Sequence, residues 1–129
     1  MRHDGAYKNL SGRSVLMVDD EEIVTEVIKE AMGPIVSAIE TAKNGEDALA
    51  KVLERDFDYI LLDIKMPKMN GMDFFRRMSS LKPYLAKRVI FITGDTESET
   101  TRSFIRTYGC SSLNKPFGIR ELLNLMAGS

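Results

Sequence analysis

The feature that most constrains this chain is a regular alternation of short apolar runs with segments of helical periodicity. Five segments are predicted to be strands: residues 14–18, 59–62 and 88–92 are strongly apolar, 37–42 is a weaker strand nearer the edge, and 112–114 is short and polar. Each is followed by a segment whose apolar residues recur at helical spacing, as Ile23, Val24, Val27 and Ile28 do after the first run. This alternation is typical of βαβ units and of a parallel sheet covered by helices on both faces. We therefore predict an α/β fold.

The length of the chain limits it to one domain. Its 129 residues fall within the roughly 100–200 residues of a typical domain. A chain of this size buries enough surface to fold without a disulfide or a structural metal. Residues 1–12 are polar and predict a flexible N-terminal arm, so we expect the folded domain over residues 13–129.

The composition excludes several classes of function. With 18 basic and 19 acidic residues, the chain lacks the basic field that binding to nucleic acid requires. Its apolar runs are far shorter than the roughly 20 residues of a membrane span. His3 is the only histidine, which argues against a His-based zinc site or a Ser/His/Asp triad. The single Cys110 and the lack of a signal peptide favour the cytoplasm.

Ligands of open parallel sheets bind beyond the carboxyl ends of the strands. The polar residues at these positions are Asp19, Asp20, Asp63, Thr93 and Lys115. Three neighbouring carboxylates repel one another unless a hard cation such as Mg²⁺ compensates them. A lysine opposite them can bind an anion such as a phosphoryl group. Singly, each aspartate could be a helix cap or a turn residue, so the prediction depends on the complete set.

This ordered set of motifs resembles the receiver domain of two-component response regulators. The matching segments are residues 15–21 (VLMVDDE), 63–67 (DIKMP) with Gly71, Thr93-Gly94 and Lys115-Pro116-Phe117. The resemblance covers about residues 14–127. It implies a flavodoxin-like, doubly wound (βα)5 fold whose five-stranded parallel sheet has the strand order 2-1-3-4-5.

The resemblance also implies a role for each matched residue. Asp63 would be the phosphoacceptor, Asp20 a direct ligand of Mg²⁺, and Asp19 an acid that holds the ion through water. The other groups follow the family in the same way: the backbone carbonyl of Lys65 would complete the metal site, Thr93 would supply the switch hydroxyl, and Lys115 would bind the phosphoryl oxygens. The Lys115-Pro116 bond is a candidate for the cis form.

The function that the resemblance implies is that of a phosphoacceptor signalling domain in a phosphorelay, with Mg²⁺ as its cofactor. A histidine kinase or a histidine phosphotransfer protein would donate the phosphoryl group, and the domain would then switch a partner-binding surface. Such a domain is no enzyme toward other molecules and promotes only its own phosphorylation and dephosphorylation. Contact with nucleic acid or with a membrane is not expected.

The sequence departs from the family pattern at one position. Ser112 lies three residues before the lysine, where the family usually has Tyr or Phe, so the usual coupling to an output surface is in doubt. In lacking this aromatic residue, the chain resembles the receivers attached to hybrid sensor histidine kinases. We expect Tyr108 to face the core from the fourth helix. Phe74 and Phe75 are adjacent in the third helix, so they cannot share one face, and one of them could lie at the surface.

The residues argue against three other functions. Hydrolases that form an aspartyl phosphate need a second aspartate two residues after the nucleophile, where this chain has Lys65. A flavodoxin-like flavin binder needs a loop rich in Ser, Thr or Gly after the first strand, but residues 19–22 are all acidic. A receiver-like scaffold that no longer takes phosphate is disfavoured by the complete set of acids.

Overall fold

The computed structural model describes residues 7–66, 68–94 and 98–128. Every strand that the sequence predicts is present within one residue of its predicted bounds, and the five helices lie between and after the strands as predicted. In chain order the elements are η1 (Lys8–Leu10), β1 (Ser14–Val18), α1 (Glu22–Met32), β2 (Ala38–Ala42), α2 (Gly45–Glu54), β3 (Tyr59–Asp63), α3 (Gly71–Leu81), η2 (Pro83–Arg88), β4 (Val89–Thr93), α4 (Glu99–Tyr108), β5 (Ser111–Asn114) and α5 (Ile119–Ala127).

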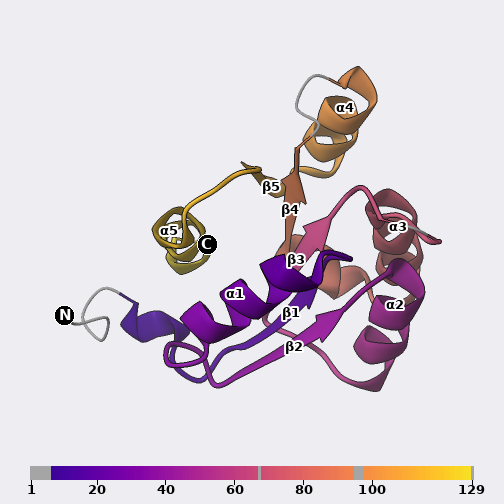
Figure 1. Cartoon of the computed structure of the whole chain (residues 1–129). Coiled ribbons are helices and arrows are strands. Elements are labelled where there is room, and N and C mark those ends of the chain that lie inside the picture. The colour runs from indigo at the N-terminus through magenta and orange to yellow at the C-terminus, as the bar shows by residue number, and fades with distance from the viewer. Residues whose placement is uncertain (1–6, 67, 95–97, 129) are drawn as a thin grey trace.

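The strands form one parallel sheet in the order β2-β1-β3-β4-β5 (Figure 1). This confirms the predicted α/β class and strand order. The three central strands are almost wholly apolar and buried, whereas β2 and β5 lie at the edges and carry polar residues. Over the described ranges, no helix combines the length and the apolar character needed to cross a bilayer.

The sheet divides the core into two layers because successive side chains of a strand point to opposite faces. Leu16 and Val18 of β1 pack with buried residues of α2, α3 and α4. Val15 and Met17 of the same strand pack instead with buried residues of α1 and α5. The two helix sets are therefore on opposite faces, and both faces of the sheet are covered.

The α3–α4 layer holds a cluster of aromatic rings that the sequence pattern did not resolve. Phe74 and Phe75 are both completely buried, so the expectation that one lies at the surface is wrong. The reason is that α3 lies between α2 and α4, which buries more than one of its faces. Tyr108 is only partly core-facing: its ring lies 4.8 Å from that of Phe104, yet 48% of the residue is exposed.

The structure also differs from the sequence prediction just before β1. Tyr7 and Leu10 are buried against the layer of α5. The Tyr7 hydroxyl donates a hydrogen bond to Asn124 Oδ1 (3.0 Å), and Asn9 Nδ2 donates one to the carbonyl of Ala127 (2.9 Å). Residues 7–10 therefore pack on the domain. Residues 1–6 lie outside the described part of the chain, and the flexible arm stays a prediction there.

Candidate functional site

The predicted site residues meet at the carboxyl edge of the sheet because the strands that carry them are parallel and in register. Val18 is paired with Leu62, so Asp19 and Asp63, the next residues of the two strands, are neighbours. Thr93 ends β4, and its backbone carbonyl accepts a hydrogen bond from the N–H of Lys115 (2.9 Å), just after β5. All five polar residues predicted from the strand ends are thus brought to one edge.

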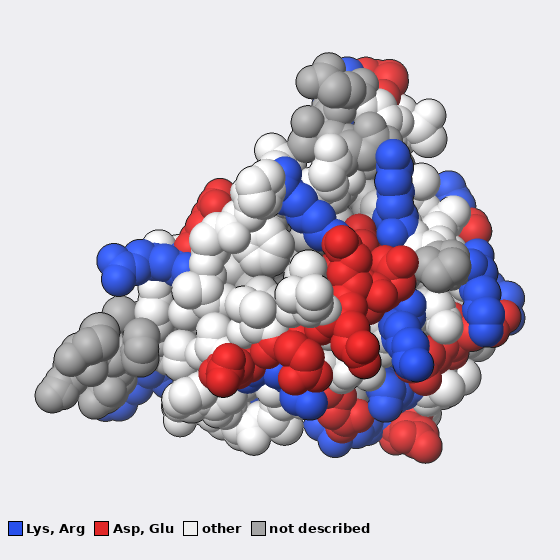
Figure 2. All heavy atoms as spheres, viewed as in Figure 1, with Lys and Arg blue, Asp and Glu red and all other residues white. Residues whose placement is uncertain are grey.

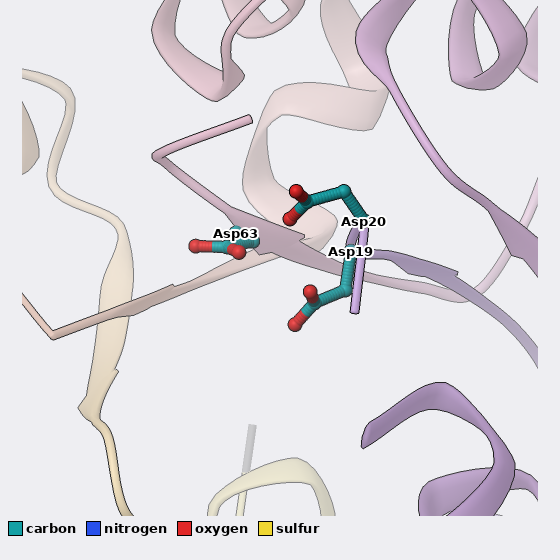
Figure 3. Close-up of side chains that lie close together, drawn as sticks. All are labelled: Asp19, Asp20 and Asp63. Carbon is teal, nitrogen blue, oxygen red and sulfur yellow. The ribbon is translucent and has the colours of Figure 1, made fainter. Parts of the chain in front are cut away.

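Three of these residues form a compact group of carboxylates. Asp19, Asp20 and Asp63 each offer an oxygen, and these oxygens lie within 4.8 Å of one another. Figure 3 shows the side chains projecting from the neighbouring ends of β1 and β3. Asp19 and Asp63 are buried, whereas Asp20 is exposed. The group therefore has a buried floor and one side open to solvent.

The ammonium group of Lys115 faces this acidic cluster. Lys115 Nζ lies 3.1 Å from Asp63 Oδ2 and 3.2 Å from Asp19 Oδ2. It also lies 3.1 Å from Glu21 Oε1, a contact that the sequence analysis missed. In the sequence, Glu21 is the third acid of the run 19–22, whose charge repels phosphate, and no local pattern links it to Lys115. Three acidic side chains, those of Asp19, Glu21 and Asp63, thus contact the Lys115 ammonium group.

Backbone groups hold the acids in place. Asp19 Oδ1 accepts a hydrogen bond from the N–H of Glu21 (2.9 Å), and Asp63 Oδ1 accepts one from the N–H of Lys65 (3.3 Å). The chain after β3 returns so closely that a Cβ atom at Gly71 would clash with the backbone of Asp63 and Ile64. Only glycine fits there, which explains its place in the motif.

The bond between Lys115 and Pro116 is cis, as expected from the sequence. Thr93 is buried, and the side chain of Lys65 is exposed. Pro67 of the matched segment lies outside the described residues. The role expected of the Lys65 carbonyl stays a prediction.

The excess of acid shows in the ionisation of the site. Burial and, next, the charge of Asp19 raise the pKa of Asp63, Lys115 only partly opposes both effects, and the resulting pKa is about 6. Burial alone would lower the pKa of Lys115, but its hydrogen bond to Glu21 and the charges of Asp63 and Asp19 raise that pKa well above its usual value. Within the described residues, the buried Asp19 Oδ2 accepts no hydrogen bond and has only the ion pair with Lys115. This donor set of hard, under-compensated carboxylates fits a divalent cation such as Mg²⁺.

The surface around the site is acidic and open. Figure 2 shows Asp and Glu side chains gathered in one patch on this face, bordered by Lys and Arg side chains. A hollow of about 530 Å³ adjoins Asp20, between the segment that follows β3 and the start of α4. Lys65, Asn70 and Thr101 are among its lining residues. The hollow therefore opens the Asp20 side of the carboxylate group to solvent.

Comparison with known sequences matches the chain to one family. The family described as response regulator receiver domain matches residues 15–127. The chain is 31% identical to the transcriptional regulatory protein ResD of Bacillus subtilis over 84% of its own length and 44% of the relative's. It is 27% identical to the response regulator receiver protein CpdR of Brucella abortus, covering 87% of this chain and 92% of that protein. The chain spans about half the length of several longer curated regulators that it matches.

Solved structures agree in fold. A CheY-like receiver domain protein from Methanospirillum hungatei superposes with a TM-score of 0.82 at 28% identity, covering 92% of this chain and 93% of that one. The receiver domain of the histidine kinase CKI1 from Arabidopsis thaliana, in complex with Mg²⁺ and BeF₃⁻, gives a TM-score of 0.80 at 25% identity. That alignment covers 97% of this chain and 94% of the receiver.

Proposed function

Because the chain belongs to the response regulator receiver domain family, we propose that it takes a phosphoryl group from a phosphohistidine onto Asp63. The observation that carries this proposal is the position of Asp63. Its carboxylate is buried at the end of β3, next to two further acids and 3.1 Å from the ammonium group of Lys115. A buried acid held between further acids and a lysine is typical of a functional site.

Asp63 acts as the nucleophile in this proposal. Although its pKa is raised to about 6, the side chain is mostly a carboxylate at neutral pH. One carboxylate oxygen attacks the phosphorus atom in line with the bond to the donor imidazole. The new P–O bond forms as the P–N bond breaks, and the imidazole keeps the electron pair and takes up a proton. The products are an acyl phosphate on Asp63 and a neutral histidine.

Asp19, Asp20 and Asp63 would hold Mg²⁺, with the backbone carbonyl of Lys65 as a further ligand. When bound, the ion neutralises charge on the transferred phosphoryl group. The close approach of three carboxylates, with one ion pair from Lys115 shared between Asp19 and Asp63, supports a further cation at this place.

Lys115 and Thr93 would bind the phosphoryl oxygens from the other side. The ammonium group of Lys115 already lies against Asp63 and needs only a short movement to contact a phosphoryl oxygen. The hydroxyl of Thr93, at the end of the adjacent strand, would donate a hydrogen bond to the same group. Both residues position charge where it develops in the transition state.

We place the histidine donor on an apolar groove between α1 and the segment after β5. Ile23 and Val27 of α1 are 81% and 57% exposed, although their spacing in the sequence suggested burial. With Pro116 and Phe117 they line a hollow of about 510 Å³ that also includes Lys115. The groove is thus continuous with the site, and the acids of the adjoining patch favour a donor helix with basic residues at its edge.

The proposal extends to setting and output. Phosphotransfer would occur in the cytoplasm, the compartment that the single cysteine favours. A hybrid sensor histidine kinase remains a candidate for the protein to which this receiver belongs. Ser112 is exposed on β5 and is paired with Phe91. Because a serine offers no ring to bury, the effect of phosphorylation would reach a partner-binding surface without the aromatic side chain that the family usually has at this position.

The central test uses acetyl phosphate with Mg²⁺ as the phosphodonor and the intact mass of the protein as readout. We expect one added phosphoryl group, lost on removal of Mg²⁺ and absent in Asp63→Asn. A wild-type protein that gains no phosphoryl mass from either acetyl phosphate or a phosphorylated histidine phosphotransfer protein would contradict the proposed function.

The docking groove has its own test. Val27→Ser should slow transfer from a phosphorylated histidine phosphotransfer protein at least about tenfold, as for loss of an interface anchor, and leave loading by acetyl phosphate unchanged. Leu53→Ser is the matched control, because Leu53 is 51% exposed on α2, on the other face of the sheet. Equal rates in the two variants would exclude the groove as the donor surface.

A further inference from the structure

Lys115 contacts three carboxylates, and one of them lies outside the group suited to hold a cation. Asp19 and Asp63 belong to that group. Glu21 does not, yet its Oε1 lies as close to Lys115 Nζ as Asp63 does, at 3.1 Å. The side chain of Glu21 is 59% exposed, so it could extend into water instead. Its position against Lys115 therefore needs a reason.

The local backbone supplies that reason. Asp19 Oδ1 accepts the N–H of Glu21, which places Glu21 at the N-cap of α1. A side chain at this position commonly accepts a hydrogen bond from its own helix. The Glu21 side chain makes no such capping bond, and its carboxylate is hydrogen-bonded to Lys115 instead. Glu21 is thus held in place by one site residue and directed at another.

We propose that Glu21 is a positioning residue that competes with the phosphoryl group for Lys115. The inference rests on the proposed phosphorylation of Asp63. A phosphoryl group on Asp63 must attract the Lys115 ammonium, and the negative charge of Glu21 both shares that ammonium and repels the incoming anion. Glu21 therefore weakens binding of small phosphoryl compounds and leaves the site dependent on a donor protein that brings its own contacts.

Binding of beryllium trifluoride with Mg²⁺ measures this competition without a chemical step. Glu21→Gln keeps the shape of the side chain and removes its charge. We expect the apparent Kd for beryllium trifluoride to fall about threefold at low salt, the effect of one partly exposed ion pair, and the difference to shrink at high salt. The KM for acetyl phosphate should fall by a similar factor, with the maximal rate unchanged.

Glu22→Gln is the matched control. It removes the same charge one residue further along, and within the described part of the chain Glu22 has no ion pair with Lys115. We expect a Kd close to that of wild type. Equal gains in Glu21→Gln and Glu22→Gln would overturn the positioning role, because the effect would then be one of net charge.

A measurement without metal or phosphoryl group tests the contact between Glu21 and Lys115 separately from its effect on anion binding. The ¹³C and ¹⁵N shifts of the Lys115 side chain in Mg²⁺-free protein should change in Glu21→Gln and stay unchanged in Glu22→Gln. If wild type binds beryllium trifluoride but Glu21→Gln leaves its Kd unchanged, the competition is wrong and the proposed function stands. If wild type neither binds this anion nor gains phosphoryl mass, the proposed function fails and the competition fails with it.

Discussion

The two ends of β3 carry charged clusters that differ in their balance of acid and base. At the carboxyl end, Asp63, Asp19 and Glu21 share the ammonium of Lys115. Before the amino end, Asp56 accepts hydrogen bonds from Lys82 Nζ (2.9 Å) and the Tyr84 hydroxyl (2.8 Å). The first cluster has more acids than donors, whereas the second has more donors than acids.

The ionisation of the two aspartates follows this balance. Hydrogen bonds from Lys82 and Tyr84 lower the pKa of Asp56 below its usual value. Burial and the charge of Asp19 raise the pKa of Asp63. Lys82 Nζ also donates to the carbonyl of Val52 (2.7 Å), which ties the end of α2 to η2. The cluster whose acid is fully paired thus joins elements of the fold, whereas the cluster with more acids than bases keeps negative charge that a bound cation would compensate.

The largest expected difference between the clusters is in phosphorylation. Asp63→Asn should abolish the gain of phosphoryl mass from acetyl phosphate and Mg²⁺, because the amide is not a nucleophile. Asp56→Asn should load at the wild-type rate. Intact mass spectrometry over a time course measures the rate of phosphorylation. Phosphorylation of the Asp63→Asn protein at the wild-type rate would exclude Asp63 as the phosphoacceptor.

Affinity for Mg²⁺ should differ by a smaller but clear factor. Asp20→Ala removes an exposed member of the carboxylate group and should weaken Mg²⁺ binding at least about tenfold, as for other changes close to a metal. Asp56→Ala should leave the affinity unchanged. Isothermal titration or the Mg²⁺-induced shift in melting temperature provides the measurement, and an unaltered shift in Asp20→Ala would exclude this residue as a ligand.

Stability without metal should change in opposite directions. Asp63→Asn removes a buried charge that neighbouring acids disfavour, so it should stabilise the metal-free protein by on the order of 1–3 kcal/mol at pH 8. Asp56→Asn weakens a favourable pair and should lower the melting temperature slightly. Denaturant unfolding in the presence of a chelator tests both, and destabilisation by Asp63→Asn would show that Lys115 compensates the cluster fully.

The smallest effect is the pH dependence of that gain. The folded protein holds the Asp63 proton more tightly than the unfolded chain, with a pKa of about 6 against 3.8. A raised acid pKa means that stability falls as pH rises between about 4 and 6. The advantage of Asp63→Asn over wild type should therefore grow across this range and level off above it. A constant difference between pH 4 and pH 7 would show that Asp63 titrates normally.

Much of the fold was predictable from local patterns. The central strands are apolar runs that end at a polar residue, and for β3 and β4 that residue is Asp63 and Thr93, both of them predicted site residues. Burial of Phe74 together with Phe75 was not predictable, because it depends on packing of α3 against two helices at once. The packing of Tyr7 on α5 joins segments that are 117 residues apart, which no local pattern reveals.

The sequence by itself determined where each strand ends, since an apolar run stops there at a polar residue. It also determined which acids and which lysine belong to the site, through the resemblance of the ordered motifs. Only the tertiary structure decided that Glu21 contacts Lys115 and that Ile23 and Val27 stay exposed. Helical spacing states which residues share a face, but whether a neighbour covers that face depends on crossover geometry. In the same way, the ionisation of Asp63 depends on the charges that the sheet brings within a few ångströms.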